Sequence, residues 1–445
     1  MKRTLLTILS LLLTASFLLS ACQTSPETEV IEEAQPEVVA EEVEEEAEPE
    51  EIAEELTLVI GFTSSITGKY ETSSGRQVRG FNLWMDQIND AGGLTLSDGT
   101  IVKFEVATYD DESNTERVQE LYTRLATEDN ADLLISPYSS GLTAAASIIA
   151  EQNGKVMITT GAAADSNYQQ GYTQVFQIYT PASRYLTGAV DLLASVGPVV
   201  TKVAFVYEDT KFSTGVVEAA KAYADGLGYE VVLYEGYAAD TTDFGSFINK
   251  IVDSGAEAIL GGGHFQDGST FARQFHEKGV DTNLFALLVA PPEPDFADLG
   301  GAALGVIGPS QWEPLAAYTP ESAEVAGVAW FGPGSDEFVT AYAGAYDGEE
   351  PSYHSAGGYA AGVVLQNAIL TADSTDPAAI KAALDAMDLM IFFGNIKFDT
   401  SEENHGLQIG HSMINIQWQE GDGGLVKQVV WPLAGATADA IYPIP

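Results

Sequence analysis

The feature that most constrains the fold is an alternation of apolar and amphipathic segments, which runs through most of the chain after residue 55. Leu56–Phe62 is apolar and β-branched, which indicates a buried strand, and Gly75–Ala91 carries apolar residues at helical spacing before Gly92 and Gly93. Further strands are expected at 101–109, 132–136, 156–160 and 175–179. This alternation predicts an α/β fold with parallel sheets that helices cover on both faces.

The alternation then restarts and predicts a second lobe. Its strands are expected at 202–207, 230–235, 258–261 and 284–289. After 306–311, three helical stretches follow one another between residues 336 and 386, and strand-like segments at 391–398, 412–419 and 425–431 close the chain. The late helices predict a return to the first lobe, and the last strands a return to the second.

Each lobe is therefore expected to be discontinuous. The first would contain residues 56–180 and 313–388, and the second residues 181–312 and 389–445. About three crossing segments would join the lobes around a cleft. Such an arrangement favours hinged closure, in which a ligand stabilises the closed state by touching both lobes.

The N-terminus has the pattern of an export signal. Met1-Lys2-Arg3 precedes an apolar stretch, Leu5–Leu19, which is shorter than the roughly 20 residues that a membrane-spanning helix needs. Leu19-Ser20-Ala21-Cys22 resembles a bacterial lipobox, in which the thiol of the cysteine is acylated. We expect a signal peptide at 1–21 and a lipid on Cys22, which place the protein outside the cytoplasm, on the periplasmic side or the outer surface of the cell membrane. An ordinary signal peptide with an incidental cysteine is the alternative.

Residues 22–55 are expected to form an acidic disordered tether. The segment from Gln23 to Glu55 contains 15 glutamates and no Lys or Arg, so like charges repel and little apolar surface can be buried. A spacer is favoured over an interaction tail. The whole chain has a formal net charge of −46, which argues against binding to nucleic acid, since that is itself a polyanion.

Several motifs, in order along the chain, resemble one known family. They are Gly61–Tyr70, Arg79–Phe81, Ile88–Leu94, Tyr109–Asp111, Ser136–Ser140, Val203–Asp209, Gly261–Gly263 and Tyr353–Gly362. The ordered set resembles the branched-chain amino acid-type solute-binding proteins that serve ABC importers. The resemblance implies the type I periplasmic binding fold, two α/β lobes with a three-crossover hinge, a small ligand in the cleft, ABC permease subunits as partners, and a monomer.

Ligands of open α/β sheets bind beyond the carboxyl ends of the strands, which selects the loops that follow them. In the first lobe, Tyr70 is placed to cover an apolar group of the ligand, or is a surface loop residue. Tyr138, Ser139 and Ser140 precede a helix, where hydroxyls and free amides suit a carboxylate, although they also suit a simple helix cap.

The resemblance adds further positions in the first lobe. It implies that Ser140 contacts the backbone groups of an amino acid, and that Gly161, Ala162 and Ala163 hold its carboxylate and ammonium. The family pattern has a hydroxyl at the position of Ala163, which this chain lacks. That departure weakens the case for a standard α-amino acid.

The second lobe offers its own candidates for the ligand site. Glu208 and Phe212 follow its first strand, and the resemblance makes Phe212 an aromatic lid; His264 and Phe265 follow its third strand. His264 would bond a ligand or cap the next helix. Some relatives pair the ligand ammonium with an acid after the fourth strand. The register places Val289 there, so either Glu293 replaces that acid or the ligand lacks an ammonium.

Catalytic residues, a cofactor and a resident metal are not expected. Cys22 is the only cysteine, the five histidines lack metal-ligand spacing, and Gly-x-Ser-x-Gly does not occur after residue 55. The function indicated is solute capture for an ABC importer, with a branched-chain or aromatic amino acid as first candidate. Receptors for short amides or urea-like compounds, a sensing subunit without transport, and a lipoprotein enzyme remain as alternatives.

Overall fold

The computed structural model describes residues 54–197, 199–316 and 318–445. The predicted signal peptide, the predicted lipidation site Cys22 and the predicted tether up to residue 53 lie outside these residues. Among the helices that are described, none is both long enough and apolar enough to cross a membrane.

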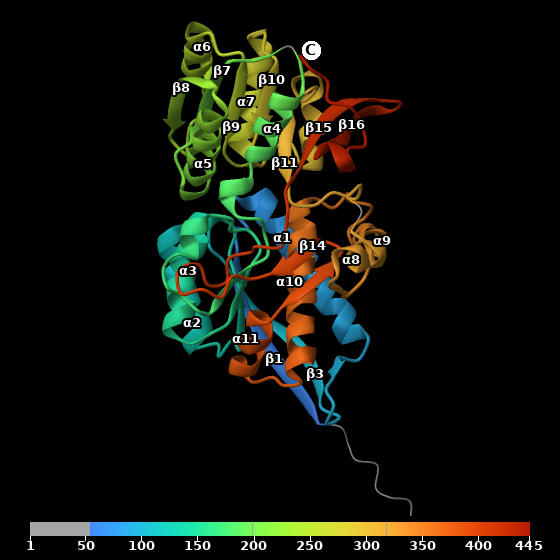
Figure 1. Ribbon diagram of the computed structural model, residues 1–445. Coiled ribbons are helices and arrows are strands. Elements are labelled where there is room, and N and C mark those ends of the chain that lie inside the picture. The colour runs from blue at the N-terminus through green and yellow to red at the C-terminus, as the bar shows by residue number, and fades with distance from the viewer. Residues whose placement is uncertain (1–53, 198, 317) are drawn as a thin grey trace, which may run out of the picture. The chain divides into compact units, whose positions relative to one another are not determined.

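A six-stranded sheet forms the centre of the first lobe (Figure 1). Its order is β2-β3-β1-β4-β5-β6, and all neighbours run parallel except β2 and β3. The strands are β1 (Glu55–Ser64), β2 (Leu94–Thr95), β3 (Ile101–Asp110), β4 (Leu133–Ile135), β5 (Met157–Thr159) and β6 (Val175–Gln177). The short central strands β4 and β5 are wholly buried, as parallel strands covered on both faces should be.

The helices of this lobe come from two separate stretches of the chain. The first stretch supplies α1 (Glu71–Asp90), α2 (Thr115–Thr127) and α3 (Ser140–Gln152), and the second supplies α8 (Pro320–Ala326), α9 (Ser335–Ala345), α10 (Tyr353–Ala372) and α11 (Pro377–Asp385). Helices α1 and α10 lie against each other at glycines. A Cβ atom on Gly358 would lie 1.9 Å from the carbonyl oxygen of Gln77, so only glycine permits this approach.

The second lobe contains a seven-stranded sheet of order β16-β15-β11-β10-β9-β7-β8. The strands are β7 (Lys202–Glu208), β8 (Glu230–Tyr237), β9 (Ala258–Gly262), β10 (Leu284–Leu287), β11 (Ile307–Ser310), β15 (Ile414–Gly421) and β16 (Gly424–Trp431). Strands β7 to β11 are parallel, whereas β15 and β16 run antiparallel at one edge. The accompanying helices are α4 (Thr187–Ser195), α5 (Lys211–Leu227), α6 (Gly245–Ser254) and α7 (Phe265–Glu277). The predicted architecture of two α/β lobes with largely parallel sheets is confirmed.

Short elements complete the described chain. They are the 3-10 helices η1 (Asp165–Asn167), η2 (Ala182–Arg184), η3 (Pro294–Ala302) and η4 (Leu433–Gly435), and the strands β12 (Ala329–Trp330), β13 (Asp388–Ile391) and β14 (Gly394–Lys397).

One predicted strand belongs elsewhere than expected. The segment at 391–398 is expected to return to the second lobe, but β13 and β14 form a separate three-stranded sheet with β12. The ring of Phe398 lies 5.2 Å from that of Phe176 in β6, so this segment packs on the first lobe. Its apolar periodicity predicts a strand without specifying the partner strand. We propose that the second lobe resumes at β15 rather than at residue 389.

Three segments run between the lobes, and they contain Thr180, Gln311 and His411 in chain order. These crossing segments are hydrogen-bonded to one another. The amide of Thr180 donates to the side-chain oxygen of Gln311 at 2.9 Å, and the side-chain nitrogen of Gln311 donates to the hydroxyl of Tyr185 at 2.7 Å. The hydroxyl of Thr180 also lies 2.5 Å from Nδ1 of His411. Because Nε2 of His411 donates to the carbonyl of Phe393, its Nδ1 accepts from Thr180. The three crossings are therefore linked at one buried point.

Candidate functional site

A small cavity lies where loops of both lobes meet. Its lining comes from the loops after β4, β5, β7, β9 and β10, from the first crossing segment, and from the first turn of α10. The lining residues are Tyr138, Ser139, Ser140, Gly161, Ala163, Tyr179, Tyr185, Phe212, His264, Val289, Tyr353 and His354. The cavity measures about 10 Å³, close to what one water molecule needs. A larger ligand would therefore have to part the lobes or displace these side chains.

Two larger hollows are also lined by residues of both lobes. One of about 600 Å³ is lined by Asp165 and Ser183 together with Asp209 and Lys211 of the second lobe. The other, of about 520 Å³, is lined by α1 residues together with Asp295 and Glu349. Both are open to solvent, so they resemble mouths of a cleft more than a binding chamber.

Most of the predicted ligand residues gather at the inner cavity. Tyr138, Ser139, Ser140, Gly161, Ala163, Phe212 and His264 line it. Tyr70 lies behind His264, with ring centres 4.8 Å apart. Ala162 and Phe265 adjoin the lining without belonging to it. Whether any of these residues contacts a ligand remains a prediction.

Ser140 connects the start of α3 to the loop after β5. Its hydroxyl oxygen accepts hydrogen bonds from the amides of Ala163 and Ala164, each at 3.1 Å. Ser139, the residue before the helix, does not cap α3 with its side chain. The first-turn amides of a helix have no partner within it, so this end of α3 suits an anionic group.

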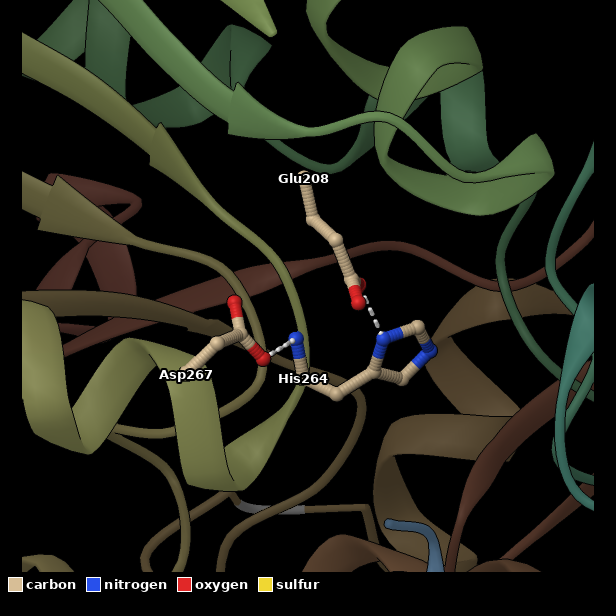
Figure 2. Close-up of side chains that lie close together, drawn as sticks. All are labelled: Glu208, His264 and Asp267. Carbon is tan, nitrogen blue, oxygen red and sulfur yellow. Dashed lines mark hydrogen bonds and ion pairs between the residues drawn. The ribbon is translucent and has the colours of Figure 1, made fainter. Parts of the chain in front are cut away.

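Glu208 anchors one charged cluster beside the cavity (Figure 2). Its carboxylate is buried at the end of β7; one oxygen lies 2.5 Å from the ammonium of Lys69 in the first lobe, and the other lies 2.5 Å from Nδ1 of His264. Burial alone would raise the pKa of Glu208, but His264 and Lys69 hold it well below its usual range. The Lys69–Glu208 pair joins the two lobes directly.

Asp267 extends this cluster into α7. It accepts the backbone N–H of His264 at 2.8 Å and the hydroxyl of Tyr237 at 2.6 Å, and burial raises its pKa to about 6. Glu208, His264 and Asp267 bring possible metal ligands within 4.8 Å of one another. The hydrogen bonds already occupy the carboxylate oxygens of both acids, and the Lys69 ammonium opposes a cation there, so hydrogen bonding accounts for the cluster.

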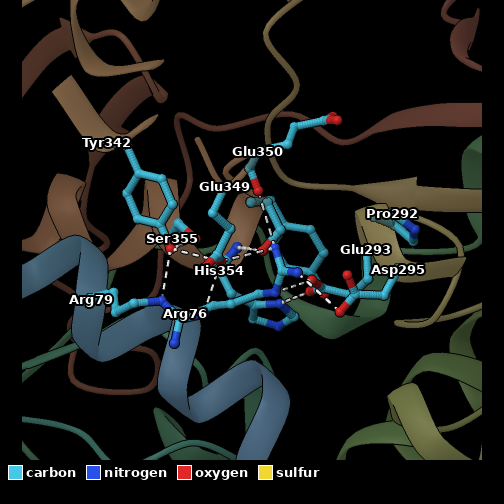
Figure 3. Close-up of polar contacts among 12 residues, drawn as sticks. Arg76, Arg79, Pro292, Glu293, Asp295, Tyr342, Glu349, Glu350, His354 and Ser355 are labelled. Carbon is cyan, nitrogen blue, oxygen red and sulfur yellow. Dashed lines mark hydrogen bonds and ion pairs between the residues drawn. The ribbon is translucent and has the colours of Figure 1, made fainter. Parts of the chain in front are cut away.

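Arg76 of α1 anchors a second charged cluster, also between the lobes (Figure 3). Its guanidinium lies 3.3 Å from Glu293 and 3.0 Å from Asp295, both in the second lobe, and 3.5 Å from Glu349. Glu293 is fully buried and also bonds Nδ1 of His354. Burial favours its neutral form, but His354 and Arg76 keep the pKa of Glu293 below its usual range. Glu293 thus belongs to an ion-pair cluster, whereas Val289 lines the cavity.

Five lining residues lie outside the predicted ligand set, and one of them, Val289, follows β10. Tyr179 and Tyr185 lie in the first crossing segment, and Tyr353 and His354 begin α10. Tyr353 and His354 begin the Tyr353–Gly362 motif, one of those that resemble the family, so the sequence does mark them. Because they lie far along the chain from the other loops, their position at the cavity could not be predicted.

Comparison with known proteins adds a family match. A family model described as periplasmic binding protein matches residues 57–423 of the chain. Leu/Ile/Val-binding protein homolog 7 from Brucella suis biovar 1 (strain 1330) is 27% identical over 401 residues, which cover 86% of this chain and 94% of that protein.

Solved structures share the fold. The branched-chain amino acid transporter substrate-binding protein LivJ from Streptococcus pneumoniae, in complex with isoleucine, has a TM-score of 0.69 at 22% identity, covering 84% of this chain and 99% of that one. A solute-binding protein of an ABC transporter from R. palustris, in complex with benzoate, has a TM-score of 0.65 at 20% identity, covering 86% and 97%. These likenesses confirm the predicted fold, the type I periplasmic binding fold.

Proposed function

Because the chain belongs to the periplasmic binding protein family, we propose that it is the solute-binding component of an ABC importer and captures a small ligand between its two lobes. The single observation that supports this best is the cavity itself. It is lined by loops at the carboxyl ends of strands in both sheets, where ligands of α/β folds bind. A ligand there touches both lobes and so favours their closure.

The ligand we propose is a small carboxylate with an apolar or aromatic body. The N-terminus of α3 provides amides for the carboxylate, and the rings of Tyr138, Tyr179, Phe212 and Tyr353 provide an apolar wall. Names of relatives suggest branched-chain amino acids, and one structural neighbour holds benzoate. Short amides remain the second candidate class.

We also propose that the receptor is held at the membrane outside the cytoplasm. The basis is the lipobox-like sequence that ends at Cys22, followed by an acidic spacer. The lipid would keep the receptor close to its ABC permease while the spacer lets both lobes move. Mass spectrometry of the protein purified from membranes should find a diacylglyceryl modification on Cys22, and an unmodified cysteine would contradict the anchor.

A thermal-shift screen tests the proposed function. The purified protein is unfolded and refolded to remove bound solute, then heated with amino acids, aromatic acids, amides or urea. A solute that binds the folded state raises the melting temperature by mass action. We expect a rise with at least one small carboxylate, and no rise with any of these compounds would contradict the proposal.

Two matched variants locate the binding. Phe212→Ala removes a ring from the cavity wall, and Phe247→Ala removes a ring from α6, outside the lining. The shift caused by the solute should shrink in F212A and persist in F247A. Equal shifts in both variants would place the solute elsewhere.

A further inference from the structure

Two histidines line the cavity, and a buried glutamate holds each of them. Nδ1 of His264 lies 2.5 Å from the carboxylate of Glu208, and Nδ1 of His354 is hydrogen-bonded to the carboxylate of Glu293. The rings come from different lobes, since His264 follows β9 and His354 lies in the first turn of α10. Both pack on the ring of Tyr138, with ring centres 5.9 and 5.1 Å from its own. A solute that contacts both histidines therefore touches both lobes.

The glutamates determine which nitrogen of each ring carries a hydrogen. Burial favours the neutral forms of Glu208 and Glu293, but the histidine and the cation beside each one keep its pKa below the usual range. An ionised carboxylate only accepts hydrogen bonds, so Nδ1 of each ring is the donor. In the neutral form of such a ring, Nε2 has no hydrogen and is an acceptor.

Both of these acceptors are unused. Within the described residues, Nε2 of His264 and Nε2 of His354 make no hydrogen bond, and Figure 2 shows the former without a contact to the other residues drawn. The two side chains are buried, with residue exposures of 4% and 1%. The cavity that they line is therefore the place where a partner for Nε2 can bind.

Two more buried acceptors near the cavity are unpaired in the part of the chain that the structure describes. Oε1 of Gln77 makes no hydrogen bond, and a Cβ atom on the lining residue Gly161 would lie 2.5 Å from it. Oε2 of Glu293 makes none either, although Arg76 lies 3.3 Å from it. Buried acceptors in proteins normally have donors. This group of acceptors therefore indicates a solute that supplies N–H groups.

We propose that Nε2 of His264 and Nε2 of His354 accept hydrogen bonds from N–H groups of the solute, so that capture requires both rings to be neutral. This inference rests on the proposed function of solute capture, and it identifies two residues that determine specificity within it. The charge of an imidazole ordinarily changes between about pH 5 and 8. A proton on Nε2 turns the acceptor into a donor, which opposes an N–H group. Binding should therefore weaken as the pH falls.

Other charged and titratable groups surround the two rings. Those around His264 are Lys69, Glu208, Asp267, Tyr70 and Tyr138. Those around His354 are Arg76, Glu293, Tyr138, Tyr179 and Tyr353. Asp267 also titrates in the same range, because burial raises its pKa to about 6. It accepts the backbone N–H of His264, so a variant that changes only the ring separates the two groups.

Isothermal titration calorimetry of the refolded protein at pH 7.5 and 5.5 tests the proton dependence. The probes with N–H groups are L-leucine, L-phenylalanine and benzamide, and 4-methylpentanoate has the leucine skeleton without the ammonium. At least one N–H probe should bind, and its affinity should fall at least about fivefold at pH 5.5, where an ordinary imidazole is mostly protonated. The affinity for 4-methylpentanoate should not fall. Circular dichroism verifies the fold at both pH values.

Two variants remove the titrating rings. His264→Gln and His354→Gln each keep a side-chain amide that can accept a hydrogen bond, so binding should persist with a pH dependence at least about twofold smaller. His276→Gln is the control, because His276 is exposed on α7, outside the lining, and should leave the pH dependence unchanged. An unchanged pH dependence in both H264Q and H354Q would overturn the inference and assign the effect to another group such as Asp267.

Nuclear magnetic resonance of the solute-free protein provides a test that does not depend on binding. Long-range proton–nitrogen spectra distinguish a ring nitrogen that carries a hydrogen from one that does not, and the two variants assign the signals. At pH 7.5 both Nδ1 atoms should carry the hydrogen. A hydrogen on Nε2 of either ring would overturn the inference.

The remaining outcomes separate the two proposals. Equal or tighter binding of the N–H probes at pH 5.5 would overturn the inference and leave solute capture intact. The same holds for a thermal-shift screen in which only solutes without N–H groups raise the melting temperature. No rise with any compound at either pH would contradict solute capture itself.

Discussion

At the scale of single residues, Ser140 shows how a predicted ligand residue also has a structural task. Its hydroxyl oxygen accepts hydrogen bonds from the buried amides of Ala163 and Ala164, and these bonds hold the loop after β5 against α3. A buried donor that loses its acceptor costs more than an average hydrogen bond contributes. The serine therefore holds the cavity wall in place before any solute arrives.

Replacing Ser140 by Ala should lower the free energy of unfolding by about 1–3 kcal/mol, because two buried amides lose their acceptor. Ser147→Ala is the control on the same helix. Its hydroxyl only donates to the carbonyl of Thr143, so its loss leaves no unpaired amide. Urea unfolding of both variants measures the difference. A cost for S140A no greater than that for S147A would contradict this role.

His411 gives a prediction about pH at the linked crossings. Burial lowers its pKa to about 4 from the ordinary 6.5, although the bond to the Phe393 carbonyl opposes the shift. The unfolded chain therefore takes up this proton first as the pH falls through that window, and the folded state loses stability. Between pH 6.5 and 5 the loss should be about 2 kcal/mol at about 1.4 kcal/mol per pH unit.

The variant His411→Gln isolates that contribution, since it lacks the titrating group. Chemical unfolding at several pH values should show wild type losing stability relative to H411Q as the pH falls. A constant difference between the two proteins from pH 7 to pH 5 would show that His411 is not held neutral.

The sequence could predict those cavity residues that directly follow a predicted strand. Ser140, Phe212 and His264 each follow a predicted strand, and each lines the cavity. Tyr179 and His354 could not be found by that rule. One lies in a crossing segment and the other begins a helix that returns from a distant part of the chain, so only the tertiary fold brings them there.

At the scale of elements, the contact between α1 and α10 depends on glycines in both helices. A Cβ on Gly80 would lie 1.8 Å from the carbonyl oxygen of Ser355, and one on Gly358 would lie 1.9 Å from that of Gln77. These distances allow no side chain without moving the backbone. The contact also positions Arg76 on α1 and His354 on α10, which share Glu293.

Gly358→Ala should therefore destabilise the protein by at least about 2 kcal/mol, as overpacking of a tight contact does. Gly344→Ala is the matched control, because Gly344 lies near the end of α9 with open space around it. There the alanine should be neutral or stabilise by up to about 1 kcal/mol. Thermal unfolding compares the two, and similar melting temperatures would show that the helices can separate at little cost.

Helices and strands could be predicted from the sequence more readily than the strands with which they pair or pack. The apolar periodicity of residues 391–398 predicts one strand, and the structure has the two strands β13 and β14 over residues 388–397. The partner strand could not be predicted, because pairing with β12 and the contact of Phe398 with Phe176 are long-range features. Apolar periodicity indicates which face of a strand is buried, but it does not indicate which sheet the strand joins.

At the scale of the whole molecule, charged pairs hold the lobes together beside the cavity. Lys69–Glu208 and Arg76–Glu293 each join one lobe to the other, and both glutamates are buried. The hydrogen bonds among Thr180, Gln311 and His411 link the crossing segments instead. These contacts favour closure before any solute binds, so a solute that enters the cleft must break some of them. The ligand-free population should therefore include both open and closed molecules.

The central claim is that the lobes close on a small solute, and small-angle X-ray scattering tests it most directly. The refolded protein is measured alone and with a saturating concentration of a carboxylate that raised its melting temperature. The account predicts a smaller radius of gyration with the solute, because binding removes the open population. Saturating binding with unchanged scattering would contradict capture by closure of the lobes.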